Sequence, residues 1–167
     1  MDQKTFSETV IAALETYNIS LVAGVPDGLF VGLIEALSDH DTIRYVACAR
    51  EEECLGVAAG AVFAGEKAAV VIQNAGLLNS LGAYATLLKR YRLPVPIFVA
   101  HRGGIFDRKA YDIEKFEATE ALGDDYFRQF RGSYAGLTQK QVEAFLQWCA
   151  AASQPGLLLL EKGEADG

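Results

Sequence analysis

The chain has 167 residues, of which 51% are hydrophobic and 22% are charged, a composition typical of one globular domain. Its formal net charge of −7 argues against non-specific binding to nucleic acid or to an anionic membrane surface. No run approaches the roughly 18 apolar residues of a membrane span, and the first residues lack the apolar core of a signal peptide.

The chain opens with a helical pattern and a short strand. Apolar residues at helical spacing predict an amphipathic helix over residues 5–17, with Thr5 and Glu8 as its capping box. An apolar strand over residues 19–25 follows. It ends at the proline- and glycine-containing turn 24–28, because proline cannot donate to a strand ladder and glycine permits a tight turn.

The same alternation continues through the next fifty residues. A second helix is expected over residues 29–37, with Asp27 as its N-cap. Strands are predicted over residues 43–47 and 68–72, and a helix rich in small residues is predicted between them, over 52–65.

A further helix is predicted over residues 77–91 and a strand over 95–100. The hydrophobic pattern of helices and strands is lost from residue 101 to 117. This segment is read as a long loop, and a loop of that length is expected to be functional or mobile. Residues 118–130 are weakly helical. A clear helix begins at Thr138 with Gln141 as its capping partner, and a last strand is expected over 156–160.

Apolar strands that alternate with helices predict an α/β fold, an open, mostly parallel sheet with helices on both faces, in a single domain spanning residues 1–167. Ligands bind such sheets at the carboxyl ends of the strands. Four polar or glycine-rich segments follow predicted strands and should therefore line one edge: 24–28, 50–51, 73–76 and 101–104.

Three consecutive glutamates, Glu51 to Glu53, directly follow the apolar run 43–49. Because burying an unpaired charge is costly, at least one of them is expected to have a function at the strand-to-helix junction. The alternative is that they are acids at a helix N-terminus, where the macrodipole favours them. We favour that alternative for Glu52 and Glu53.

The helix behind these acids carries Gly56, Gly60 and Ala64 on one face. Each interior glycine costs about 1 kcal/mol relative to alanine, so close approach of another backbone should compensate. Two interpretations stay open, tight packing on the chain's own sheet and contact with a partner subunit.

The sequence lacks the common motifs by which a single domain binds a cofactor or carries a nucleophile on its own. The sequence contains no dinucleotide-binding glycine fingerprint, no phosphate-binding loop and no nucleophile elbow. With only two histidines, and three cysteines that form no zinc or disulfide pattern, no metal site is predicted. Reduced thiols favour a cytoplasmic protein.

Three stretches resemble a known family. They are Gly24-Val25-Pro26-Asp27-Gly28-Leu29, Arg50-Glu51-Glu52-Glu53 followed by Ala58-Ala59-Gly60, and Gln73-Asn74-Ala75-Gly76-Leu77-Leu78-Asn79-Ser80, with weaker support from residues 94–103. Together they are similar to the pyrimidine-binding domain of thiamine-diphosphate enzymes. More narrowly, they resemble the α subunit of sulfopyruvate decarboxylase and the matching part of phosphonopyruvate decarboxylase.

The resemblance implies a catalytic role for Glu51, which lies nine residues before Gly60. The family's glutamate hydrogen-bonds a ring nitrogen of the aminopyrimidine and so favours the imino tautomer that activates the thiazolium. A 2-oxo acid then loses CO2 while the thiazolium ring holds the electrons. A carboxyl group suits this task because it can share a proton with a weakly basic nitrogen.

The resemblance also implies cofactor-binding residues. Gln73, Asn74 and Asn79 would offer amide hydrogen bonds to the aminopyrimidine, with Gly76 in the same turn and Pro26 in the first strand-end loop. The alternative for the stretch 73–80 is a polar helix cap.

Asp27 is either an N-cap or a catalytic acid near the substrate, and both roles are compatible. His101 and Arg102 are candidates for binding a sulfonate or phosphonate, because arginine suits tetrahedral anions. The alternative is a salt bridge within the loop, and Arg108 and Lys109 carry the same ambiguity.

The family's diphosphate-binding domain, marked by Gly-Asp-Gly and a later asparagine, has no counterpart here, since Gly123-Asp124-Asp125 lacks a suitable continuation. The resemblance therefore implies a hetero-oligomer in which a β subunit supplies that domain. The cofactors are thiamine diphosphate and Mg²⁺, with Mg²⁺ held mainly by the partner chain.

The leading hypothesis is the α subunit of a split thiamine-diphosphate-dependent decarboxylase, a carboxy-lyase that acts on sulfopyruvate or phosphonopyruvate. One alternative keeps the cofactor but performs carboligation or decarboxylates another small 2-oxo acid. The other is a non-catalytic α/β binding or regulatory domain.

Overall fold

A single six-stranded sheet organises the molecule in the computed structural model, which describes residues 3–107 and 109–163. The strand order is β2-β1-β3-β4-β6-β5, and every neighbouring pair is parallel. The strands are β1 (Leu21–Gly24), β2 (Arg44–Ala47), β3 (Ala68–Gln73), β4 (Pro96–Ala100), β5 (Gln129–Ser133) and β6 (Gly156–Glu161).

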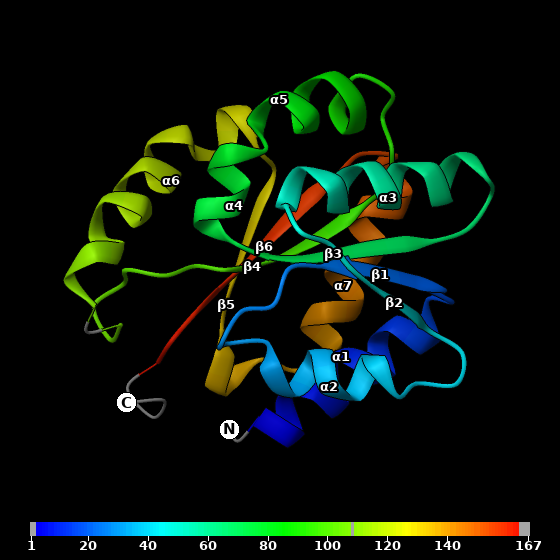
Figure 1. The fold of residues 1–167 in the computed structure, drawn as a ribbon, viewed down its shortest axis with the longest axis horizontal. Coiled ribbons are helices and arrows are strands. Elements are labelled where there is room, and N and C mark those ends of the chain that lie inside the picture. Colours follow the sequence, from blue (N-terminus) through cyan, green and yellow to red (C-terminus); the bar gives the residue numbers. More distant parts are fainter. Residues whose placement is uncertain (1–2, 108, 164–167) are drawn as a thin grey trace.

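Helices cover both faces of the sheet (Figure 1). On one face lie α1 (Gln3–Thr16), α2 (Val31–Ser38) and α7 (Gln139–Ala152). On the other lie α3 (Glu51–Phe63), α4 (Asn74–Asn79), α5 (Leu81–Ala83), the π-helix η1 (Tyr84–Lys89) and α6 (Ile113–Tyr126). Two short 3₁₀ turns, η2 (Ala110–Asp112) and η3 (Tyr134–Gly136), complete the described elements. The predicted fold class is confirmed.

Alternate residues of the central strands fill two separate cores, which explains their continuous apolar sequences. In β3, Ala69 and Val71 pack against α1, α2 and α7, whereas Val70 and Ile72 pack against α3 and η1. Successive strand side chains point to opposite faces, so a strand covered on both sides must be apolar throughout.

The helix expected over residues 77–91 is broken into α4, α5 and η1. The Ser80 hydroxyl donates to the Gly76 carbonyl oxygen at 2.7 Å, and the Ser80 backbone N–H also bonds to that oxygen. Such back-bonding of serine to the preceding turn competes with regular helix geometry and bends helices. The break lies beside the candidate site.

The second half of the chain differs most from expectation. The edge strand β5 was not predicted, because its sequence is polar and only half-buried. The helix expected from residue 118 begins at Ile113, so the loop after β4 is shorter than 101–117. Residue 108, and with it the prediction for Arg108, lies outside the described residues.

The two predicted capping boxes had different outcomes. Thr5 lies inside α1, which already contains Gln3, so a cap at Thr5 is wrong. At α7 the prediction is confirmed: the Gln141 backbone N–H donates to the Thr138 hydroxyl, and the Gln141 side-chain oxygen accepts from the Thr138 N–H at 2.9 Å. Within the described part of the chain, no helix has the length and apolar character needed to cross a membrane.

Candidate active site

The four strand-end segments do lie along one edge of the sheet. They follow β1, β2, β3 and β4, which are adjacent and parallel, so their carboxyl ends meet on the same side. Crevices at this edge are where open parallel sheets bind ligands. The end of β6, marked by Glu161, joins the same edge.

Glu51 is the first residue of α3, and its side chain lies directly on the backbone of α4. A Cβ atom added to Gly76 would come within 2.1 Å of the Glu51 Cγ and 2.3 Å of its Oε1. Only glycine therefore allows the carboxyl group to rest in this position. The predicted catalytic glutamate and the predicted cofactor-binding glycine form one structural unit.

A cavity of about 390 Å³ adjoins this unit. Glu51 and Asn79 line it, together with Arg50, Glu52 and Ser80. The cavity thus combines a carboxylate, which accepts hydrogen bonds, with a side-chain amide, which both donates and accepts. A polar heterocycle with ring nitrogens and an exocyclic amine needs such a set of partners.

The other two amides of this stretch lie differently. Asn74 is fully buried, and its Nδ2 donates to the Arg102 carbonyl oxygen at 3.0 Å, which ties α4 to the loop after β4. Its Oδ1 has no hydrogen-bond partner among the described residues. Gln73 ends β3 at the N-terminus of α4, where its side chain forms no cap. Pro26 is exposed in the first loop.

A second cluster joins the loops after β1 and β4. The guanidinium Nη2 of Arg102 donates to both carboxylate oxygens of Asp27, at 3.0 and 3.3 Å. Its Nη1 lies 3.7 Å from a carboxylate oxygen of Asp107. All three side chains are at most 12% exposed. Asp27 also accepts from the Leu29 N–H at 2.8 Å, so it stabilises the turn before α2 while facing Arg102.

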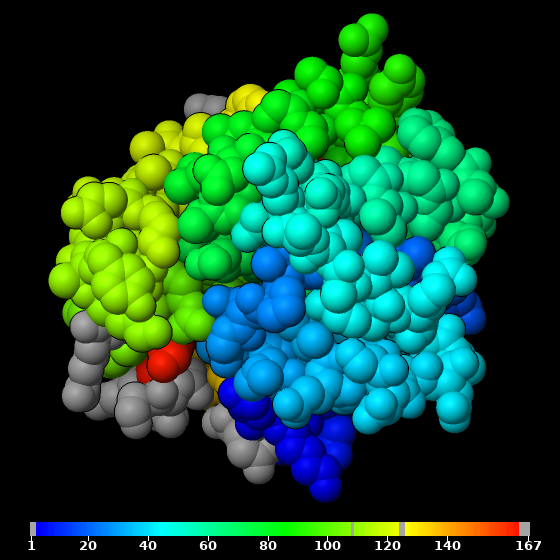
Figure 2. Space-filling view, viewed as in Figure 1, coloured from blue at the N-terminus to red at the C-terminus, as the bar shows by residue number. Residues whose placement is uncertain are grey.

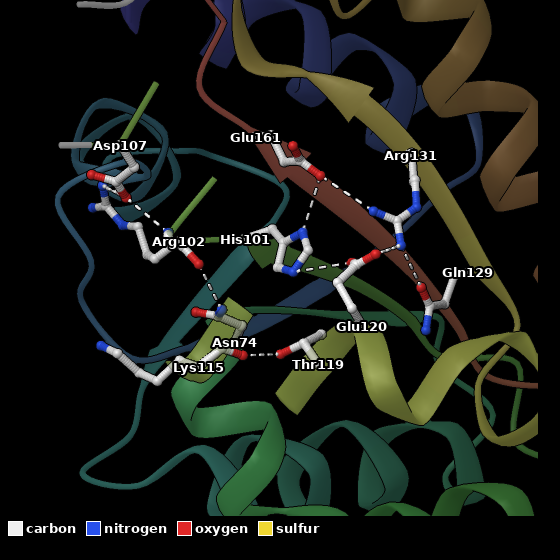
Figure 3. A network of polar contacts seen from close by, with 11 residues as sticks. Asn74, His101, Arg102, Asp107, Lys115, Thr119, Glu120, Gln129, Arg131 and Glu161 are labelled. Carbon is white, nitrogen blue, oxygen red and sulfur yellow. Dashed lines mark hydrogen bonds and ion pairs between the residues drawn. The ribbon is translucent and has the colours of Figure 1, made fainter. Parts of the chain in front are cut away.

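A third cluster surrounds His101 (Figure 3). Its Nδ1 lies 3.2 Å from Glu161 Oε1 and its Nε2 lies 3.5 Å from Glu120 Oε1. The ring stacks on Phe116, with centroids 4.4 Å apart. Arg131 donates to Glu120 at 2.8 Å and lies 3.3 Å from Glu161. Because the His101 side chain has no exposed surface, the geometry assigns it to this network rather than to an open substrate pocket.

The network changes the acidity of one carboxyl group. The hydrogen bond from His101 lowers the pKa of Glu161 below its ordinary value, and the electrostatic interactions with His101 and Arg131 act in the same direction. Partial burial opposes this shift. The lowered pKa shows that the surroundings favour the ionised carboxylate.

Sequence reasoning missed several of these residues. Glu161 directly follows the last predicted strand, so its position at a carboxyl end could have revealed it. Glu120 and Arg131 gave no such signal, because one lies within the segment 118–130, expected to be weakly helical, and the other directly follows it, in a strand that was not predicted. Asp107 was hidden in the loop where the hydrophobic pattern fails.

The three cysteines are free thiols. Burial raises the pKa of Cys149 to about 12 and also raises the pKa of Cys54, so both side chains behave as small buried hydrophobic residues. Cys48 is only half-buried. Among residues 3–107 and 109–163, no group of three or more His, Cys, Asp or Glu side chains is placed to hold a metal ion.

This chain is similar to known proteins in both sequence and fold. The family model described as "Thiamine pyrophosphate enzyme, N-terminal TPP binding domain" matches residues 4–114. Sulfopyruvate decarboxylase subunit alpha of Methanococcus maripaludis is 34% identical over 116 residues, which cover 70% of each chain. Phosphonopyruvate decarboxylase of Streptomyces viridochromogenes is 32% identical over 94 residues, covering 56% of this chain and 24% of that protein.

A solved structure shares the fold. Benzoylformate decarboxylase from Polynucleobacter necessarius superposes with a TM-score of 0.70 at 17% sequence identity, covering 93% of this chain but only 29% of its own length. The matched family region contains the strand-end segments that carry Glu51, Gly76 and Asn79. The chain therefore belongs to the family of the N-terminal TPP-binding domain of thiamine pyrophosphate enzymes.

Proposed function

We propose that this chain is the α subunit of a split thiamine-diphosphate-dependent 2-oxo acid decarboxylase that acts on sulfopyruvate or phosphonopyruvate. The observation that carries the proposal is the carboxyl group of Glu51, which rests on Gly76 beside a cavity that Asn79 also lines. The names of the two relatives supply the substrate class.

The residues around the cavity fit the aminopyrimidine part of the cofactor. Thiamine diphosphate, when bound, supplies a carbon nucleophile and an electron sink for decarboxylation. In our proposal Glu51 shares a proton with a ring nitrogen of the pyrimidine. Asn79 offers an amide hydrogen bond, and Gly76 leaves the space beside α4 that the Glu51 side chain occupies. Gln73 and Pro26 complete the proposed cofactor-binding set at the adjacent strand ends.

The Asp27–Arg102 pair is the proposed substrate-facing element. Asp27 serves as the acid near the reacting carbon, and Arg102 holds it in place through two hydrogen bonds. An incoming sulfonate or phosphonate would compete with Asp27 for the guanidinium, which suits tetrahedral anions. Asn74 and His101 then act as positioning residues, because they anchor the loop that carries Arg102.

We further propose that a β subunit supplies the diphosphate-binding domain and holds Mg²⁺. The support is twofold. The sequence lacks a complete Gly-Asp-Gly signature, and the chain covers 70% of an α subunit but only 24% of the phosphonopyruvate decarboxylase chain. The free thiols suit a complex that works in the cytoplasm.

The test is reconstitution. The chain is co-expressed with a partner polypeptide from the same source that carries the Gly-Asp-Gly and asparagine signature, and CO2 release is measured with thiamine diphosphate and Mg²⁺. Sulfopyruvate and phosphonopyruvate are compared with pyruvate, and the aldehyde product distinguishes decarboxylation from carboligation. Equal turnover of pyruvate contradicts the substrate assignment. A cofactor-loaded complex without turnover of any 2-oxo acid favours the non-catalytic alternative.

A further inference from the structure

Two of the three cysteines lie against each other at the junction of β2 and α3. Cys48 directly follows β2, and its backbone N–H donates to the Gly24 carbonyl oxygen at 2.9 Å, which extends the pairing of β2 with β1. Cys54 lies in α3, where its Sγ is 3.6 Å from the Arg50 carbonyl oxygen. The two thiol groups are in hydrogen-bond contact, and Tyr45 interacts electrostatically with both. A strand end and a helix therefore hold two sulfur atoms side by side.

The two thiols differ in their access to solvent. Cys54 is fully buried, whereas Cys48 is half-buried and is followed by the exposed residues Ala49 and Arg50. Figure 2 shows the segment that leads from β2 into α3, in cyan, on the visible face beside the green of α4. A dissolved oxidant can thus reach Cys48 first, and Cys54 lies directly behind it. Cys149 differs from both, because it is buried in the core on the other face of the sheet.

The segment between the two cysteines contains Glu51. A bond from Cys48 to Cys54 would close a ring around residues 48–54. A disulfide bond is about 2 Å long, shorter than a hydrogen-bond contact, so closing the ring draws the end of β2 and the start of α3 toward each other. The Glu51 carboxyl group rests so closely on Gly76 that not even a Cβ atom fits between them. It therefore moves away from Gly76 when the start of α3 shifts.

We propose that Cys48 and Cys54 are a reversible redox pair, which a low-molecular-weight disulfide such as oxidised glutathione converts into an internal disulfide that displaces Glu51 and inactivates the site. The loss of activity rests on the proposed function, whereas the formation of the disulfide does not. Disulfides in a reducing compartment are usually transient and often sense the redox state, which fits a pair of neighbouring free thiols.

The reaction is thiol–disulfide exchange in two steps. The Cys48 thiol loses its proton, and its sulfur attacks one sulfur of oxidised glutathione. A Cys48–glutathione disulfide forms, and one glutathione thiolate leaves and takes up a proton. The Cys54 thiol then loses its proton, and its sulfur attacks the Cys48 Sγ, so that the second glutathione leaves as a thiol. In sum, the two protein thiols lose two protons and two electrons, and the oxidant is reduced to two glutathione molecules.

Burial raises the pKa of the Cys54 thiol, which makes the second step slow. The glutathione adduct on Cys48 should therefore appear before the internal disulfide. This order of events distinguishes the pair from two cysteines that react independently.

The experiment incubates the full chain with oxidised glutathione, blocks the remaining thiols and digests the chain with trypsin without reduction. Trypsin cuts at Arg50, between the two cysteines, so peptides 45–50 and 51–67 stay joined only through a disulfide. We expect the joined peptides and a fall from three free thiols to one, which dithiothreitol reverses. Cys48→Ser should abolish both the adduct and the disulfide, and Cys54→Ala should keep the adduct alone. Cys149→Ala is the matched control and should still form the disulfide.

Two further measurements test the effect on Glu51. Amide hydrogen exchange of the isolated chain should become faster in residues 74–79 of α4 on oxidation, because the Glu51 side chain no longer packs on them. CO2 release by the reconstituted complex should fall by up to about 100-fold. Reduction should reverse both effects, and Cys48→Ser should show neither. The exchange measurement needs no partner chain, so a reduced complex without activity counts against the proposed function and leaves the exchange result to decide this inference.

A chain that keeps three free thiols in oxidised glutathione overturns the proposal. So does a glutathione adduct on Cys48 that never gives way to the internal disulfide. A disulfide that leaves the exchange of residues 74–79 unchanged overturns the link to Glu51, as does an oxidised complex that remains fully active.

Discussion

Replacing Gly76 with alanine tests the central geometric feature of the candidate site. The new Cβ would lie 2.1 Å from the Glu51 Cγ, 2.2 Å from its Cδ and 2.3 Å from its Oε1. Favourable contacts between carbon atoms need about 3.5–4.0 Å. The Glu51 carboxyl group must therefore move by more than about 1 Å, away from the α4 backbone.

The expected effects on stability and on catalysis differ. Alanine gains about 1 kcal/mol of helix propensity over glycine. Pushing a flexible side chain off its preferred rotamer costs about 0.5–1.5 kcal/mol. These terms nearly cancel, so the free energy of unfolding should change by no more than about 1 kcal/mol. A catalytic group misplaced by about 1 Å can lose about 100-fold in rate.

The assay measures CO2 release by the reconstituted complex and urea unfolding of the isolated chain. Gly82→Ala is the matched control, because Gly82 also lies in a helical segment and an added Cβ there meets nothing within 4 Å. The control should gain up to about 1 kcal/mol of stability and keep its activity. Gly76→Ala should keep its stability and lose roughly 99% of its activity.

Full activity in Gly76→Ala would refute the reasoning, because it would mean that the position of the Glu51 carboxyl group does not matter. A large loss of stability would refute it differently, by showing that the contact supports the fold rather than the site.

Three further predictions concern the clusters at the sheet edge. Glu51→Gln should lower CO2 release by about 10²–10⁴-fold, because an amide cannot share the proton, while the unfolding temperature stays unchanged. Asp27→Asn should destabilise the chain by about 3 kcal/mol in urea unfolding, because it leaves the nearly buried Arg102 without its main partner. Glu161 has a lowered pKa in the folded state, so its contribution to stability is present above its ordinary pKa and disappears as the pH falls through the lowered value. Thermal unfolding of wild type and Glu161→Gln should therefore converge in acid and diverge toward neutral pH.

Each of these expectations has a contrary result. Undiminished turnover in Glu51→Gln would remove that residue from the proposed chemistry. An Asp27→Asn variant as stable as wild type would show that the pair with Arg102 contributes little to folding. A stability difference for Glu161→Gln that stays constant across the acid range would contradict the lowered pKa.

Much of the fold could be predicted from local patterns. Five of the six strands lie where the apolar runs place them. Four of these are interior strands, which are covered on both faces and must be apolar along most of their length. The fifth, the edge strand β2, is only partly buried but still lies in an apolar run. The edge strand β5 has no such requirement. It could therefore not be predicted from the sequence. The start of α6 was missed as well, because it lies in the segment that was predicted to be a long loop.

The candidate site was likewise predictable only in part. Glu51, Gly76 and Asn79 were found from motifs in sequence order, and the structure brings them together beside one cavity. His101 and Arg102 were found as residues, but their surroundings were not. Their partners Glu161, Glu120 and Asp107 lie far away or in segments without periodicity, and only the folded sheet edge places them within a few ångströms.

The sequence by itself determined the parallel α/β class and the family, and it identified Glu51 as the candidate catalytic residue, because each depends on neighbouring residues and their spacing. Only the tertiary structure decided what the glycines do. Gly76 is required because a side chain from another helix occupies its space, whereas Gly56 and Gly60 face outward with nothing near them. Hydrophobic periodicity records which side of an element is buried, but it cannot record which neighbour lies there, since that depends on contacts between distant parts of the chain.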